Sequence, residues 1–176
     1  SLSQEAFDDL AAYSAAFLSA KRESFEQRAG ERRIRDCHGD LHSANIYLEN
    51  GISFLDCIEF NRRFRYGDVA SDVAFPAMDL DFHGRRDLST AFVQAYVQSS
   101  GDTGVEELLD FFKSYRAYVR AKVTSFRLDD PLLSPTDREE ALATAQAYYS
   151  LAHSYTRVIP RPSLFLVAGL MGTGKS

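Results

Sequence analysis

Apolar residues recur every three to four positions over most of this chain, which is the period of an amphipathic α-helix. The pattern predicts one helix before the first motif and four after it, over approximately residues 4–28, 68–82, 85–99, 104–129 and 136–158. The fourth of these carries its apolar stripe at Leu108, Leu109, Phe112, Tyr115, Val119, Val123 and Phe126. We expect this stripe to face the core of a domain whose fold class is α+β and mostly α.

A different pattern occupies residues 46–55. Two four-residue segments flank the dipeptide Asn50-Gly51, which is the strongest short-range signal for a β-hairpin with a two-residue turn. In that register the numbers of paired residues sum to 101, so that Asn45 is expected to face Asp56. Directly opposed residues have Cβ atoms about 5 Å apart on one face of a sheet. An amide and a carboxylate held in this way can share one Mg²⁺ ion, whose ligand distances are roughly 2.1 Å.

Candidate chemistry lies just before the hairpin, in the run His38-Gly39-Asp40-Leu41-His42-Ser43-Ala44-Asn45. Transfer of a phosphoryl group from ATP to a hydroxyl needs a carboxylate that orients and deprotonates the hydroxyl. It also needs an amide oxygen on a metal ion, and a second carboxylate that holds the metal against the phosphates. Protein kinases place the first two groups as Asp-x-x-x-x-Asn on one loop, and Asp40 and Asn45 have this spacing. The candidate second carboxylate is Asp56.

These motifs together resemble the aminoglycoside phosphotransferase and choline kinase family of small-molecule kinases. The resemblance covers about residues 35–82 and rests on His38-Gly39-Asp40-Leu41-His42-x-x-Asn45, then Asp56, then Gly67-Asp68-Val69-Ala70-Ser71-Asp72. It implies the C-terminal lobe of a protein-kinase-like fold, with a small hairpin at the catalytic loop. It further implies that Asp40 is the catalytic base and that Asn45 and Asp56 are magnesium ligands. Cys57 departs from the pattern, because many members have Trp at that position.

Several residues of these motifs also have interpretations that do not involve phosphoryl transfer. His38, Asp40 and His42 could bind a catalytic metal directly, as in metallohydrolases, but no further histidine lies nearby in the sequence. We therefore interpret His38 and His42 as hydrogen-bonded support of the catalytic loop. Asp68 stands at the N-cap position of the predicted helix 68–82, and Asp72 follows one turn later. Structural support is the favoured role for both acids, which the family resemblance assigns to bracing the loop.

The end of the chain carries a second motif. An apolar run at 163–168 is typical of a buried parallel strand, and the eight residues after it fit G-x-x-x-x-G-K-[ST]. In such a loop the backbone N–H groups wrap the phosphates of a nucleotide and the lysine reaches the β- and γ-phosphates. The candidate nucleotide-binding residues of this loop are Gly169, Gly172, Thr173, Gly174, Lys175 and Ser176. We interpret 1–158 as the phosphotransferase lobe, 159–162 as a linker, and 163–176 as the first strand and P-loop of a truncated NTPase or kinase domain.

Kinase-like folds bind ATP against an upstream β-rich lobe that carries a phosphate-covering loop and a lysine. Only one predicted helix precedes the catalytic loop in this sequence. We therefore expect an N-terminal lobe and a downstream P-loop domain to belong to a larger parent protein. Residues 1–176 alone are expected to bind Mg·ATP weakly and to be inactive.

Composition narrows the classes of function. A hydrophobic content of 45% with 26% charged residues is ordinary for a globular domain, and a net charge of −5 argues against nucleic acid as a partner. No apolar stretch approaches the roughly 18 residues of a membrane span. The two cysteines, Cys37 and Cys57, give no disulfide framework, and we interpret them as reduced thiols of a cytoplasmic protein.

The leading hypothesis is thus an ATP- and Mg²⁺-dependent phosphotransferase that acts on a hydroxyl of a small molecule. Two alternatives are a non-catalytic kinase-like domain that binds or regulates a P-loop kinase, and a metallohydrolase. The acceptor has no readable signature. The acids Glu59, Asp79 and Asp81 could attract a cationic acceptor, although surface carboxylates are common in an acidic protein. The arginines Arg62, Arg63 and Arg65 could meet a phosphate, although a solvated or ion-paired loop is the favoured interpretation.

Overall fold

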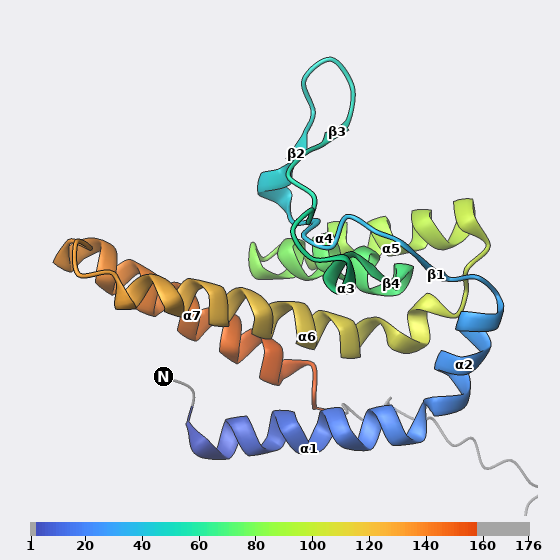
Figure 1. Cartoon of the computed structure of the whole chain (residues 1–176), viewed down its shortest axis with the longest axis horizontal. Coiled ribbons are helices and arrows are strands. Elements are labelled where there is room, and N and C mark those ends of the chain that lie inside the picture. Colours follow the sequence, from blue (N-terminus) through green and yellow to red (C-terminus); the bar gives the residue numbers. More distant parts are fainter. Residues whose placement is uncertain (1–2, 158–176) are drawn as a thin grey trace, which may run out of the picture.

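The computed structural model describes residues 3–157, so the linker and the P-loop segment predicted at 159–176 lie outside the described residues. The described part is α+β and mostly helical, as predicted (Figure 1). Its helices are α1 (Gln4–Ala20), α2 (Arg22–Gly30), α3 (Arg62–Arg65), α4 (Val69–Phe82), α5 (Arg86–Ser100), α6 (Val105–Phe126) and α7 (Pro135–Ser154), with 3-10 turns η1 (Ser43–Asn45) and η2 (Arg127–Asp129). Its strands are β1 (Ile34–Asp36), β2 (Ile46–Tyr47), β3 (Ser53–Phe54) and β4 (Tyr66–Asp68).

None of the helices within residues 3–157 is both long enough and apolar enough to cross a membrane.

The predicted helices after residue 67 are confirmed to within a few residues, and their ends carry the expected signals. The Ser134 hydroxyl accepts a hydrogen bond from the Asp137 N–H at the start of α7, and Gly101 takes the left-handed conformation at the end of α5. The single helix predicted over 4–28 is wrong, because two helices cover this region. The break falls at Lys21, where φ is −105° and ψ is 16°. The chain changes direction there, and α2 leads away from α1 toward β1 (Figure 1).

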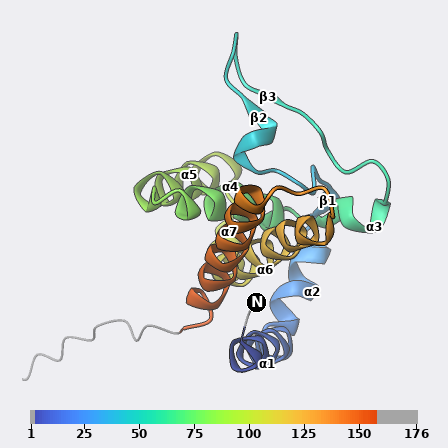
Figure 2. The ribbon, with the colours of Figure 1, turned by 90° about the vertical axis from the view of Figure 1, so that its left-hand side faces the viewer.

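Helix α4 is buried along most of its length and supplies residues to two core clusters. The first cluster comprises Leu10, Phe75, Met78, Ala117, Ala121, Tyr148 and Ala152, from four helices. The second comprises Ala70, Val73, Ala77, Val93, Val105 and Leu108. Because α4 contacts α5, α6 and α7, it forms the platform on which the connecting loops rest. Figure 2 shows α6 and α7 side by side.

The apolar stripe predicted for α6 is only partly right. Leu108 is fully buried, but Tyr115, Val123 and Phe126 are 49%, 49% and 59% exposed. The inward face instead carries Arg116 and small residues such as Ala117 and Ala121. Small side chains let packed helices approach closely, so the large residues that hydropathy favours are left on the outer face.

The hairpin register differs from the predicted one. The pairs are Ile46 with Phe54 and Tyr47 with Ser53, so the sum is 100 and not 101. The two-residue turn is wrong as well, because a longer loop over residues 48–52 connects the strands and Asn50 takes a φ of 56° within it. A loop with one residue more on one side shifts every later pair by one position. Asp56 therefore does not face Asn45 in the ladder.

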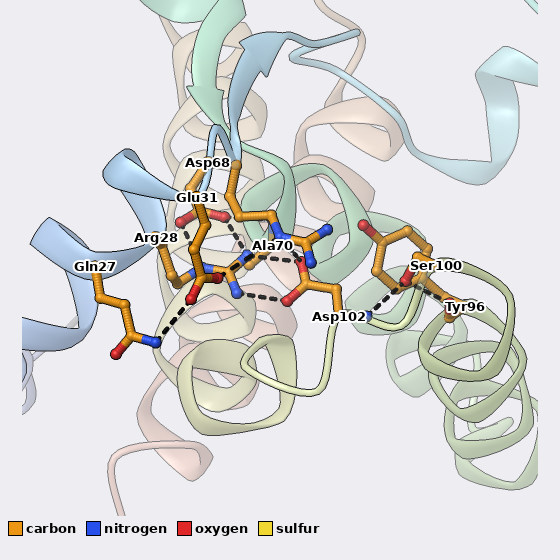
Figure 3. Close-up of polar contacts among 9 residues, drawn as sticks. Gln27, Arg28, Glu31, Asp68, Ala70, Tyr96, Ser100 and Asp102 are labelled. Carbon is orange, nitrogen blue, oxygen red and sulfur yellow. Dashed lines mark hydrogen bonds and ion pairs between the residues drawn. The ribbon is translucent and has the colours of Figure 1, made fainter.

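A buried charge network fixes α2 against the rest of the domain (Figure 3). Arg28 of α2 is only 4% exposed. Its guanidinium donates two hydrogen bonds of 2.7 Å to Asp68, and two more of 2.7 and 3.0 Å to Asp102. Asp68 also caps α4 by accepting the Ala70 N–H at 2.8 Å. One side chain thus joins α2, the start of α4 and the turn before α6.

Loss of this guanidinium should destabilise the whole domain. In Arg28→Met the buried Asp68 loses its cation and Asp102 keeps only Arg33 at 3.7 Å, and breaking a buried ion pair costs about 3–5 kcal/mol. Urea unfolding followed by circular dichroism measures this change in the free energy of unfolding. The matched control is Arg22→Met, which removes an exposed i,i+4 pair with Glu26 that contributes at most about 0.5 kcal/mol. Equal small losses in both variants would contradict a central role for Arg28.

Candidate functional site

His38 joins the two segments that carry the predicted catalytic residues. Its ring Nδ1 accepts a hydrogen bond of 3.3 Å from the Asp40 N–H, and its Nε2 lies 2.8 Å from the Leu55 carbonyl oxygen. Since a backbone N–H can only donate, Nδ1 is the acceptor and Nε2 carries the proton given to Leu55. The His38 carbonyl in turn accepts the Ile58 N–H at 3.0 Å. These are the contacts of a scaffold residue, and they leave no ring nitrogen for a metal.

The turn before Asp40 is clamped between α4 and α6. The Asp72 carboxylate of α4 accepts the His38 N–H at 2.6 Å and the Gly39 N–H at 3.0 Å. From the other side, Arg116 of α6 donates to the Gly39 carbonyl at 2.6 Å and to the Ser71 carbonyl at 3.2 Å. Arg116 also lies 3.6 Å from the Asp72 carboxylate. The backbone just before Asp40 is therefore held by a carboxylate on one side and a guanidinium on the other.

Asp40 is partly open to solvent and stands in a positive environment. Its side chain is 36% exposed, and Oδ2 lies 3.6 Å from the His42 Nε2. His42, followed by the more distant Arg120 and Arg116, holds the pKa of the Asp40 carboxyl below its usual range, although burial acts in the opposite sense. Because the pKa is lowered, Asp40 stays ionised at neutral pH and can accept a hydrogen bond from a hydroxyl.

The His42 Nε2 lies between two neighbours and can bond to only one of them at a time. Its Nε2 lies 3.4 Å from Arg120 Nη1 and 3.6 Å from Asp40 Oδ2. Arginine can only donate, so the first contact needs the lone pair of Nε2, whereas the second needs a proton there. The imidazole is buried against the Phe75 ring, with 5.6 Å between ring centroids. His42 thus supports the loop from the α4 side.

Asn45 and the residues around it complete the loop. The Asn45 side chain is buried, and its Nδ2 donates to the Asp40 carbonyl at 2.9 Å. This bond fixes the amide and turns Oδ1, the atom that a metal would bind, away from that carbonyl. Ser43 donates its N–H at 2.9 Å to Asp79, a carboxylate of α4 that is only 3% exposed. The 3-10 turn η1, which presents Asn45, is therefore fixed to α4 as firmly as the turn before Asp40.

Asp56 follows the hairpin in a conformation that the sequence did not predict. It is exposed and has a φ of 61°, so the extended backbone ends one residue after β3, at Leu55. Its neighbour Leu55 is bound on both sides, because its N–H donates to the Asn45 carbonyl at 3.0 Å and its carbonyl accepts from His38. The segment that carries Asp56 is thus attached to both parts of the catalytic loop, although the expected direct opposition to Asn45 is absent.

The donor atoms of the predicted site suit a magnesium ion shared with a nucleotide better than a metal bound by histidine and carboxylate ligands alone. Within residues 3–157 no group of three or more His, Cys, Asp or Glu side chains is arranged to hold a metal ion. His38, Asp40 and His42 therefore gain no support as a metallohydrolase site. A magnesium ion shared with a nucleotide needs fewer protein ligands, since Mg²⁺ keeps several waters and binds phosphate oxygens. Asn45 Oδ1 and the Asp56 carboxylate are oxygen donors of the type that Mg²⁺ prefers.

Four acids on α4 and at its start have structural roles, and three of them correct the sequence analysis. Asp72 and Asp79 hold the catalytic loop, and Asp68 lies in the Arg28 network instead. Asp81 accepts from Lys113 at 2.9 Å and from the Tyr155 hydroxyl at 2.6 Å. Asp79 and Asp81 are thus buried and already partnered, and neither is a surface carboxylate that could attract a cationic acceptor.

Sequence reasoning missed two residues that position the loop. Asp79 follows the apolar run 74–78, and Arg116 lies four residues after Phe112 on the predicted apolar face of α6. A charged residue on an otherwise apolar helix face is the signal that could have identified both, because such a residue is buried only with a partner. The partner itself cannot be read from the helix pattern.

Comparison with known proteins adds relatives but no activity. No family model matches the chain, and no solved structure matches it. The chain is 40% identical over 161 residues to the uncharacterized protein Rv2004c of Mycobacterium tuberculosis strain H37Rv and to the uncharacterized protein Mb2027c of Mycobacterium bovis. The match covers 91% of this chain but 31% of each relative, so the chain spans about a third of the length of the curated relatives it matches. It is therefore similar to one segment of longer mycobacterial proteins.

Weakening the Asp72 clamp should loosen the loop before it unfolds the domain. Asp72→Asn keeps the shape of the side chain but replaces an ionised acceptor of two N–H groups with a neutral amide, and bonds to charged groups contribute about 1.5–3 kcal/mol. We expect amide hydrogen exchange at His38 and Gly39 to accelerate by about tenfold or more. Asp87→Asn, at an exposed carboxylate paired with Arg85, is the control and should leave both amides unchanged. Unaltered exchange in Asp72→Asn would show that the clamp does not hold the loop.

Proposed function

We propose that this chain is the catalytic lobe of an ATP- and Mg²⁺-dependent phosphotransferase that phosphorylates a hydroxyl of a small molecule, with a protein-kinase-like fold. The observation that carries the proposal is the double hydrogen bond of the His38 ring. One nitrogen holds the backbone of Asp40 and the other holds the residue before Asp56. Two acids that a phosphotransferase needs are thereby attached to one rigid support, and Asn45 is bonded to the same backbone.

Asp40 is suited to orienting the acceptor hydroxyl. Phosphoryl transfer passes through a loose transition state in which the hydroxyl keeps its proton until late, so positioning contributes more than base strength. The lowered pKa makes Asp40 a weak base that is always ionised at neutral pH. Its exposed face and its clamped backbone let it accept a hydrogen bond from a substrate in a fixed position.

Asn45 and Asp56 would hold the metal. Mg²⁺ bound there would neutralise negative charge on the phosphates of ATP. Asn45 offers an amide oxygen whose orientation is fixed by its bond to the Asp40 carbonyl. Asp56 offers a carboxylate on a solvent-exposed segment, where a nucleotide can reach it.

A second candidate is a non-catalytic kinase-like domain that serves a neighbouring P-loop domain. The observation in its favour is the hairpin register, which leaves Asp56 without the direct opposition to Asn45 that the metal site was predicted to use. Phosphotransfer and metal binding by the full-length protein that carries these residues separate the two candidates.

Asp40→Asn should abolish most phosphotransfer without unfolding the domain. An amide cannot take the proton, and loss of a general base lowers turnover by about 10²–10⁴-fold. ADP release by the full-length protein in the presence of a panel of polyhydroxy compounds identifies an acceptor and then measures turnover. Glu49→Gln, which removes an exposed carboxylate of the hairpin loop, is the matched control and should retain full turnover. Wild-type turnover in Asp40→Asn would exclude Asp40 as the base.

Substitution of either proposed ligand should weaken binding of the metal–nucleotide complex. Asn45→Ala and Asp56→Ala each remove an oxygen donor, and we expect the affinity for Mn·ATP to fall by about tenfold or more, as for perturbed metal sites in general. Electron paramagnetic resonance of Mn²⁺ titrated into the full-length protein with ATP reports this affinity. Ser53→Ala, on the same hairpin, is the control. Unchanged Mn²⁺ binding in both variants would favour the non-catalytic candidate.

A further inference from the structure

An arginine-rich surface lies beside the catalytic loop of this acidic chain. Six of its 20 lysine and arginine residues fall in two short segments, at Arg32, Arg33, Arg35, Arg62, Arg63 and Arg65. Pairing of β1 with β4 brings the two segments together. Within residues 3–157, Arg65 pairs with Asp36 and Arg33 lies 3.7 Å from Asp102. The other four arginines have no carboxylate within 4.0 Å in that part of the chain, and their charges add to one local field.

Arg62 and Arg63 are exposed and, with Tyr66, border a shallow, open hollow of about 260 Å³ that is lined mainly by the apolar parts of these side chains. Arg62 is held in place there, because its Nη2 donates to the Tyr66 hydroxyl at 3.4 Å and its guanidinium lies 5.2 Å from the centre of the Tyr66 ring. This single bond leaves most of the Arg62 N–H donors available. Two aromatic rings, Phe60 and Phe64, lie in contact beside this segment and are 83% and 58% exposed.

The segment that carries this hollow packs directly against the turn before Asp40. The Cys37 N–H donates to the Arg65 carbonyl at 3.0 Å. A Cβ on Gly39 would lie 3.1 Å from the Phe64 carbonyl oxygen, and the φ of 82° at Gly39 also requires glycine. Helix α3 is therefore adjacent to the residue before the proposed base, and it leads directly into β4, the partner strand of β1 (Figures 1 and 2).

We infer that the acceptor is an organic anion, and that Arg62 and Arg63 bind its carboxylate or phosphate group while its hydroxyl faces Asp40. This inference rests on the proposed function. A guanidinium presents paired N–H donors that match the two oxygens of a carboxylate or phosphate, and exposed aromatic rings can cover the carbon skeleton of such a molecule. Of the three acids considered for a cationic acceptor, Asp79 and Asp81 are bonded within the protein. The third, Glu59, is exposed beside this surface but is outnumbered by its six arginines.

Four hexose probes with one scaffold and different charges test the inference. Saturation-transfer NMR with the 176-residue chain compares glucuronate and glucose 6-phosphate with neutral glucose and cationic glucosamine. We expect the two acids to bind more tightly than the other two sugars, and the preferred acid tells carboxylate from phosphate. In Arg62→Gln/Arg63→Gln their affinity should fall by about tenfold or more. Arg86→Gln removes an exposed arginine of α5 and should change nothing.

Two results would overturn the inference. One is equal binding of all four sugars, and the other is binding of the acids that the double variant does not weaken. This test is independent of the test of the proposed function, because probe binding requires neither ATP nor turnover. Loss of turnover in Asp40→Asn together with acceptors that are neutral or cationic would keep the phosphotransferase and reject the anion site. Arginine-dependent binding of acids without any phosphotransfer would do the reverse.

Discussion

The guanidinium of Arg28 balances two carboxylates, Asp68 and Asp102, that are almost fully removed from water. Charges buried in this way are tolerated only when each has a partner and good hydrogen-bond geometry. Arg28 meets that condition with four short bonds, and it has room to do so because Gly104 carries no side chain. A Cβ at Gly104 would lie 2.8 Å from the Arg28 Nη1. The position of α2, the first turn of α4 and the start of α6 all follow from this one contact.

Helix α4, whose start is held by the Arg28 network, in turn holds the loop around Asp40. Its first residue follows the N-cap residue Asp68, and Asp72 and Asp79 project from it to hold the backbone on either side of Asp40. Arg116 adds a bond from α6 to the same turn. The loop has little regular structure of its own, so its geometry is fixed by side chains of the helices under it. Such an arrangement supplies positional accuracy, which the phosphotransfer that we propose would require.

Several acidic residues of this chain are bonded inside the domain, whereas basic residues gather near Asp40. The chain is acidic overall, but several of its acids are used internally, and the arginines near Asp40, Arg116 and Arg120, come from α6. Positive potential around an ionised carboxylate keeps it ionised and attracts anionic ligands toward it. Both the nucleotide and the acceptor that we propose are anions, so the same positive potential would attract both.

The sequence by itself determined the helices after residue 67, the mostly helical α+β class and the motif from His38 to Asn45. Helix period, capping residues and motif spacing are local properties, and local interactions suffice to produce them. Tertiary structure decided the rest. The break at Lys21 depends on Arg28 reaching partners 40 and 74 residues away, and the burial of Arg116 depends on the loop it supports. The predicted hairpin register is wrong because Asn50-Gly51 alone does not specify the loop length, and the base of the hairpin is held by bonds from Leu55 to Asn45 and His38. Pairings between distant residues leave no period in the sequence, and only the folded chain shows them.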